Sequence, residues 1–284
     1  MSQCKRAAPS MQWLDFSFSV FLCLGALFPC FIRAEVVRIG GTGSGLETMN
    51  ILAKSFQSKN PNFQFEVVPS LGSSGGIRAV SSRFIQIAVS NRLPKPAEAM
   101  AGMQSIEYAK TPFVFVTSKS GVNNLKLTEI ADIYAGRQIK WSDGSPVRLV
   151  LRDLGDSDNT VLAAMSPEMK EAMLMAHKRK GMRIALSDQE SIDAIDELSG
   201  SIGASTLALV HAEKRRAKVL SVNGVEPTIA NLKNGRYPYS KDLYLIYLET
   251  NISVEVKRFL LFIRSAEGQR LMTQVGNLPV NAVR

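Results

Sequence analysis

Cysteine is nearly absent from this chain, and its positions exclude several kinds of site. The sequence of 284 residues has three cysteines, and all of them lie near the N-terminus, at Cys4, Cys23 and Cys30. The segment 35–284 therefore has neither a disulfide nor a thiolate ligand for zinc or an iron–sulfur cluster. A segment of that length can bury enough apolar surface to fold without a disulfide.

Histidine is also scarce, and the common catalytic motifs are missing. His177 and His211 are the only histidines, and neither has a neighbour at metal-ligand spacing. We interpret both as surface residues on basic helices. No Gly-Lys-Ser/Thr phosphate loop, Ser–His–acid set or paired-carboxylate motif stands out. We therefore predict no catalytic residue, no metal and no cofactor.

The longest apolar run is confined to the N-terminus. Lys5 and Arg6 precede the apolar stretch 16–31, which is too short and too broken to predict a membrane span. A basic start, an apolar centre and a small residue before the cleavage point are typical of a secretory signal peptide. We predict that residues 1–34 are this signal peptide, with Met11 as an alternative start, and that the mature protein is periplasmic.

The net charge is positive but dispersed. The chain carries +9, of which the three basic residues and one acidic residue of 1–34 account for +2, leaving +7. The only basic runs, at 178–180 and 214–216, lie near the expected ends of helices, where cations are favoured. Nucleic acid is therefore not a predicted partner, whereas a small anion is compatible with the charge.

A glycine-rich loop follows the first apolar run of the segment 35–284. The β-branched stretch 36–39 leads into 40–45 (GGTGSG), and then Leu46, Met49 and Leu52 recur at helical spacing. Free N–H groups at a helix start attract anions, and glycines let an anion approach the backbone. Alone, this loop is equally compatible with a plain tight turn.

Two more polar loops follow predicted strands. The loop 72–77 (GSSGGI) comes after a strand at 63–68, and the loop 152–160 (RDLGDSDNT) comes after a strand at 147–151. Strand–loop–helix units favour a parallel sheet whose ligands lie at the carboxyl ends of its strands. Three such loops predict a shared anion site.

The rest of the segment reads as further strands and helices. We expect strands at 85–89, 111–117, 182–186, 219–222 and 243–248, and helices at 127–135, 166–181, 187–200, 254–263 and 266–272. The small residues at 201–206 predict one more turn.

With these motifs in view, the chain resembles the phosphate-binding proteins of periplasmic ABC-type uptake systems. The resemblance covers nearly all of 35–284 and is carried by 42–45 and 72–77, supported by 131–136, 200–203 and 266–269. It implies an α/β, two-lobed periplasmic binding protein (type 2) with a hinge and a ligand cleft between the lobes. Lobe 1 would comprise 35–115 plus 243–284, and lobe 2 would comprise 116–242.

The resemblance also implies a set of ligand-binding residues. Backbone N–H groups, hydroxyls and one arginine would surround a dehydrated oxyanion. The implied set is Thr42, Gly43, Ser44, Gly45, Ser73, Ser74, Gly75, Asn91, Arg152, Ser157, Asp158 and Asn159.

Two positions depart from the family's pattern. Asn91 stands where the family usually has an aspartate that accepts a proton from phosphate. An amide oxygen still accepts that hydrogen bond, but it carries no charge to repel sulfate. The family's arginine is followed by Ser-Gly-Thr at the start of a helix, whereas this chain has 157–160 (SDNT) there, one residue further on, which introduces Asp158. Asp158 either turns away at the helix start or reaches the ligand and requires a protonated one.

The resemblance implies a monomeric solute-binding protein that delivers phosphate, or a related tetrahedral oxyanion, to an ABC-type permease of the inner membrane. An exported sensor or an orphan binding protein without a transport role is an open alternative. A nucleotide-dependent enzyme is a weaker one. The spacing of Gly41, Gly43 and Gly45 departs from the dinucleotide pattern, although Glu66 lies near the place of a ribose-binding acid.

Overall fold

The fold is given by a computed structural model that describes residues 36–280. The predicted signal peptide, residues 1–34, lies outside the described residues. Among the helices of 36–280, none has both the length and the apolar character needed to cross a membrane.

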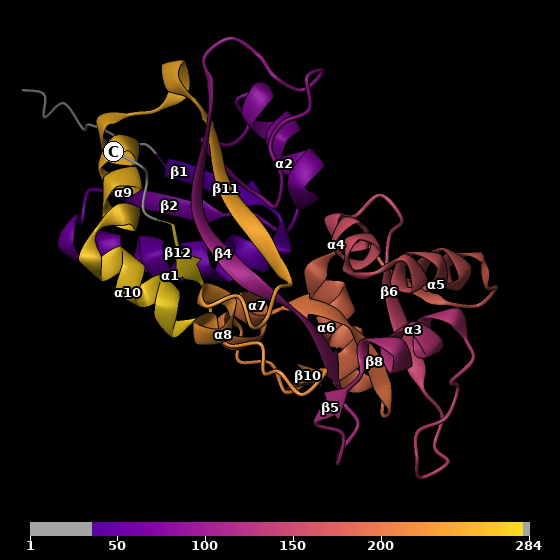
Figure 1. The fold of residues 1–284 in the computed structure, drawn as a ribbon. Helices are drawn as coiled ribbons and strands as arrows, with labels where there is room; N and C mark the ends of the chain where they lie inside the picture. The colour runs from indigo at the N-terminus through magenta and orange to yellow at the C-terminus, as the bar shows by residue number, and fades with distance from the viewer. Residues whose placement is uncertain (1–35, 281–284) are drawn as a thin grey trace, which may run out of the picture. The chain divides into compact units, whose positions relative to one another are not determined.

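A ten-stranded mixed sheet forms the framework (Figure 1). Its main strand order is β2-β1-β3-β11-β4-β8-β6-β7, and β9 and β12 pair with β4. The strands are β1 (Val36–Gly41), β2 (Gln64–Val67), β3 (Ile87–Ser90), β4 (Met103–Thr117), β6 (Arg148–Arg152), β7 (Arg183–Ala185), β8 (Ser201–Thr206), β9 (Lys218–Val219), β11 (Ser240–Leu248) and β12 (Leu278–Pro279). A separate two-stranded sheet pairs β5 (Asn124–Leu125) with β10 (Ser221–Val222).

Parallel pairing is confirmed for the strands that precede the three polar loops. β1 pairs in parallel with β2 and β3, and β6 pairs in parallel with β7 and β8. The sheet as a whole is mixed, because β11 runs antiparallel to both β3 and β4. β4 begins eight residues before the predicted strand; its residues 103–112 pair with β11, and 113–117 pair with β8. One long strand thus joins the two parts of the sheet.

The predicted helices are all present, and several begin at a serine whose side chain accepts a backbone N–H. The helices are α1 (Gly43–Lys59), α2 (Gly72–Ser81), α3 (Leu127–Ala135), α4 (Ser157–Met165), α5 (Pro167–Lys178), α6 (Asp188–Glu197), α7 (Leu207–Ala212), α8 (Ile229–Lys233), α9 (Val254–Arg264) and α10 (Ala266–Gln274), with a 3₁₀ turn at Glu249–Asn251. Ser166, Ser187, Ser253 and Ser265 are such caps. The short α7 and α8 were not expected.

Buried side chains form separate hydrophobic clusters on the two parts of the sheet. Two clusters draw on 37–109 and 243–272, and two others draw on 113–222 together with Tyr237. Phe113 and Phe115, which the sequence places at the end of lobe 1, pack with residues of 116–242. The lobe boundaries 35–115, 116–242 and 243–284 stay a prediction.

The expected turn at 201–206 is wrong, because these residues form the inner strand β8 between β4 and β6. Their small side chains reflect tight packing against neighbours. A Cβ added to Gly203 would lie 2.7 Å from Ile195 Cδ1 and 3.0 Å from the Val150 carbonyl oxygen. Composition alone could not separate a turn from a closely covered strand.

Gly41 fixes the end of β1 just before the first polar loop. Its φ is +124°, and an added Cβ would lie 2.0 Å from the carbonyl oxygen of Val89 on β3. Side chains rarely adopt this φ, and a backbone atom cannot turn aside as a side chain can. The position therefore requires glycine.

We predict that Gly41→Ala lowers the free energy of unfolding by about 3 kcal/mol or more, because it adds a backbone clash to conformational strain. Gly144→Ala is the matched control, since Gly144 also has positive φ but open space around its Cβ position. Urea unfolding of the two variants measures the difference. Equal losses would contradict the proposed clash.

Candidate anion-binding site

The first polar loop is anchored between β1 and β3. The backbone N–H of Thr42 donates to the Val89 carbonyl at 2.9 Å, so the loop lies beside the residues that follow β3. α1 begins at Gly43, and both Thr42 and Ser44 are almost fully buried. The start of α1 therefore presents two hydroxyls, and a backbone N–H that has no partner within the helix, to an enclosed place.

Asn91 aligns these hydroxyls. Its side-chain oxygen accepts hydrogen bonds from Thr42 Oγ1 and from Ser44 Oγ, both at 2.9 Å. Its side-chain nitrogen donates to the Asp242 carbonyl at 3.2 Å. The amide oxygen expected to face a ligand thus serves the loop of Thr42. Its role as a ligand contact stays a prediction.

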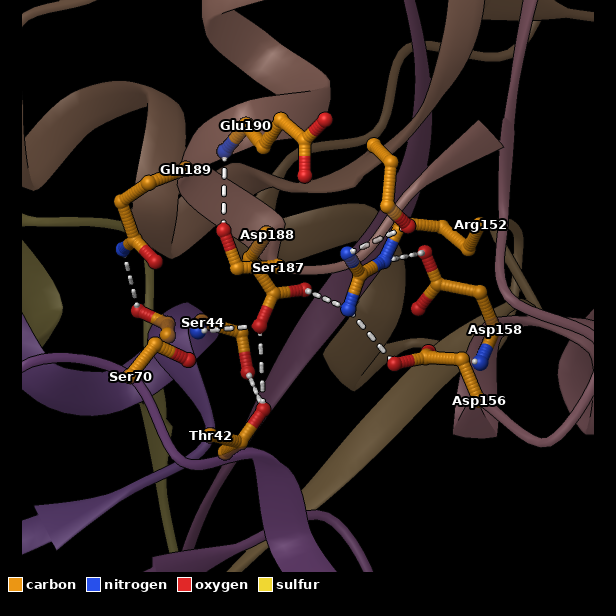
Figure 2. Close-up of polar contacts among 12 residues, drawn as sticks. Thr42, Ser44, Ser70, Arg152, Asp156, Asp158, Ser187, Asp188, Gln189 and Glu190 are labelled. Carbon is orange, nitrogen blue, oxygen red and sulfur yellow. Dashed lines mark hydrogen bonds and ion pairs between the residues drawn. The ribbon is translucent and has the colours of Figure 1, made fainter. Parts of the chain in front are cut away.

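A carboxylate from another part of the chain fills the place in front of α1 (Figure 2). Asp188 Oδ2 accepts from the Ser44 backbone N–H at 3.1 Å, and it lies 3.2 Å from Thr42 Oγ1, whose single hydrogen it shares with Asn91 Oδ1. Its other oxygen lies 3.8 Å from a guanidinium nitrogen of Arg152. The donors predicted for an oxyanion therefore surround the side chain of Asp188.

Arg152 is the buried cation of this place. It ends β6, is 5% exposed, and donates to Asp156 Oδ2 at 2.6 Å and to the Ala185 carbonyl at 3.3 Å. A third carboxylate, that of Asp158, lies 3.9 Å from its Nε. Burial opposes the charged form, but Asp188, Asp156 and Asp158 together raise the pKa of Arg152. The guanidinium stays charged.

Lys241 supplies the second buried cation, and it forms an ion pair with Asp158. Burial raises the pKa of Asp158 to about 6, with Asp156 and Asp188 adding to the effect and Lys241 opposing it. For Asp156, burial acts in the same direction, but Lys241 and Arg152 outweigh it and lower the pKa. Three carboxylates thus share two cations. Within residues 36–280, no group of His, Cys, Asp or Glu side chains is arranged so that it could hold a metal ion.

The second polar loop lines a neighbouring cavity of about 550 Å³. Ser73, Ser74 and Gly75 of α2 contribute to it, together with Asn91 and with Ser157 of α4. The oxygens of Ser73 and Ser74 accept N–H groups from Asn91 and Arg92. Because each hydroxyl oxygen already accepts, its own hydrogen is available to an acceptor in the cavity.

The structure therefore separates the predicted residues into groups. Thr42, Ser44 and Arg152 surround the Asp188 carboxylate, whereas the second loop and Ser157 face the cavity, and Asn91 contacts both. Gly45 is closely covered, because an added Cβ would lie 2.6 Å from Val89 Cγ1, whereas at Gly43 it would meet only the flexible end of Gln189, 2.1 Å from Oε1. The role of both glycines as ligand contacts stays a prediction.

Asp158 and Asn159 are both buried in the third loop. Asp158 faces Lys241, while Asp156 is the N-cap of α4, so Asp158 does not act as the cap. Asn159 donates to the Asp153 carbonyl at 2.7 Å, and its oxygen lies 3.3 Å from His177 Nε2. Both ends of the Asn159 amide thus already contact other residues of the chain, and its role as a ligand contact stays a prediction.

The sequence interpretation missed Asp188, Asp156 and Lys241. Asp188 lies in the first turn of the predicted helix 187–200, whose cap Ser187 accepts the Glu190 N–H at 3.0 Å. A signal was nevertheless present: β6 and β7 are adjacent and parallel, so the residues that follow β7 come close to Arg152. Lys241, on β11, has no local motif that marks it.

A family profile described as the PBP superfamily domain matches residues 32–267. The chain belongs to the PBP superfamily. Two proteins named phosphate-binding protein PstS are similar to it. That of Borreliella burgdorferi is 22% identical over 87% of this chain and 90% of its own length, and that of Bacillus subtilis is 23% identical over 87% and 82%.

A solved structure from Clostridium perfringens, named as a phosphate ABC transporter substrate-binding protein with bound phosphate, is also similar. It is 25% identical, covers 87% of this chain and all of its own, and has a TM-score of 0.72. The predicted fold class, an α/β periplasmic binding protein of type 2, is confirmed.

The raised pKa of Asp158 makes a prediction about stability. Between its ordinary value of 3.8 and the folded value of about 6, the folded chain keeps a proton that the unfolded chain loses. The contribution of Asp158 to the free energy of unfolding must therefore fall as pH rises from 4 to 6, by about 3 kcal/mol at most.

Chemical unfolding of the wild type and Asp158→Asn at several pH values measures this contribution as the difference between them. The wild type should lose stability relative to the variant from pH 4 to 6, and the difference should be constant above pH 7. A difference that does not change with pH would contradict the assignment.

Proposed function

We propose that this chain is an exported solute-binding protein that captures phosphate or a related tetrahedral oxyanion and delivers it to an ABC-type permease. The observation that carries the proposal is the carboxylate held by Ser44 N–H, Thr42 Oγ1 and Arg152. A carboxylate and an oxyanion offer the same kind of acceptor to the same donors. The place in front of α1 is thus suited to a small anion.

The adjoining cavity supports this proposal. The serines of the second loop line it with the cations Arg78, Arg92 and Lys95, and the carboxylates of Asp153, Asp156 and Asp242 line it as well, so its serine hydroxyls rather than an excess of positive charge suit it to an anion. The relatives named PstS and the phosphate-bound neighbour favour phosphate over other oxyanions. Export is supported by the signal-peptide pattern of 1–34.

We propose that capture involves no chemical step and that residues 35–115 with 243–284 and residues 116–242 close around the ligand. Membership of a solute-binding superfamily supports this view. A sensor or orphan binding protein would use the same site and differ only in the protein it contacts. Restored phosphate uptake by a strain that lacks its own binding protein would separate transport from sensing.

Titration calorimetry with phosphate, sulfate, arsenate and molybdate tests the ligand, using protein unfolded and refolded to remove any bound anion. We expect heat with phosphate. If the site selects a ligand that carries a proton, sulfate, which carries none, should bind more weakly. No heat with any of the four anions would end the proposal.

We predict that Arg152→Ala weakens phosphate binding at least about tenfold, because it removes a buried charge-assisted partner. Thr42→Val, which deletes one donor and keeps the side-chain volume, should weaken binding in the same direction. Arg137→Ala is the control, since Arg137 pairs with Asp132 on the surface. Unchanged affinity in both site variants would remove this place from the ligand site.

A further inference from the structure

The side chain of Asp188 stands where the proposed function places the ligand. It accepts the Ser44 N–H in the first turn of α1, lies beside the hydroxyl of Thr42 and the charge of Arg152, and its residue is 8% exposed. Figure 2 shows the carboxylate between these groups, with α6 behind it. A carboxylate so enclosed is bound as an anionic ligand would be.

We propose that Asp188 is an internal competitor for the oxyanion: its carboxylate occupies the anion position and must leave before the ligand takes the same donors. This inference rests on the proposed function and adds a residue that sets the affinity. Asp188 therefore opposes binding, in contrast to Arg152, Thr42 and Ser44, which favour it.

The charges around Arg152 and Lys241 indicate that the oxyanion replaces the carboxylate of Asp188 rather than binding beside it. Arg152 and Lys241 carry two positive charges, whereas Asp156, Asp158 and Asp188 carry three negative charges when ionised. An added oxyanion would place more negative charge within the same enclosed space, where like charges repel strongly. Exchange of Asp188 for the ligand avoids this repulsion.

The start of α6 holds the start of α1 at a second point. Gln189 Nε2 donates to the Gly43 carbonyl at 3.2 Å and to Glu213 Oε1 at 2.8 Å. Asp188 is thus tethered beside its donors, and a tethered group competes at an effective concentration in about the millimolar range. Displacement must move the side chain of Asp188, or the first turn of α6, away from Ser44.

Asp188→Asn and Asp188→Ala test the inference by calorimetry with inorganic phosphate. We expect the dissociation constant to fall at least about tenfold in Asp188→Ala, and in the same direction in Asp188→Asn, which keeps the shape and removes the charge. Asp193→Asn is the matched control on α6, because that side chain is half exposed and pairs with Arg215. Its affinity should equal that of the wild type.

Formate gives a second readout that does not depend on phosphate. In Asp188→Ala the deleted carboxylate leaves its donors in place, so millimolar formate should raise the melting temperature of this variant more than that of the wild type or Asp193→Asn. The same melting curves show whether each variant is folded. Equal effects of formate on all three proteins would overturn the inference.

The outcomes separate the inference from the proposed function. If the wild type binds phosphate and Asp188→Ala binds equally or more weakly, the internal competitor is overturned and the solute-binding function stands. Phosphate binding by Asp188→Ala alone would support the inference in its strongest form. If neither protein binds any of the four oxyanions, the proposed function fails, and so does competition with such a ligand.

Discussion

A negative charge buried in front of Ser44 must be met by donors that are already in place, and the rest of the site follows from this constraint. The carboxylate of Asp188 lies at hydrogen-bond distance from two of these donors, the Ser44 N–H and Thr42 Oγ1. Asn91 holds the hydroxyls, and the glycine at 41 brings β1 close enough to β3 for Asn91 to reach them. The helix start supplies partial positive charge without a formal cation. A single anion therefore organises residues from three loops.

The third loop itself carries buried carboxylates, which need cations nearby. Asp156 caps α4 and also receives Arg152, while Asp158 lies deeper and depends on Lys241 from β11. Removing either cation would leave a buried carboxylate unpaired, which is costly. Burial still raises the pKa of Asp158 to about 6, because Lys241 and Arg152 offset only part of this effect. The site can hence take up a proton more readily than a site with one carboxylate per cation.

Local sequence patterns predicted the polar loops, most helices and the parallel strands before those loops, because glycines, caps and apolar periodicity are local signals. The family resemblance implied Thr42, Ser44 and Arg152 as ligand residues, and these three do lie around Asp188. The local patterns failed where the cause is not local. The small side chains of β8 predict a turn, but they reflect a neighbour, Ile195. No local pattern marks Asp188, because its partners Thr42 and Ser44 lie more than a hundred residues away. Antiparallel pairing of β4 with β11 likewise depends on distant segments.

Asp188 also bears on how the parts of the chain hold together. It is contributed by residues 116–242 and its donors by residues 35–115, so the same hydrogen bonds that fill the anion position join these segments. A ligand that takes these donors removes both hydrogen bonds to Asp188. Because Arg152 lies on the same part of the chain as Asp188, the oxyanion can replace the carboxylate as the bridge. Occupancy by ligand and contact between the segments are therefore coupled through one set of donors.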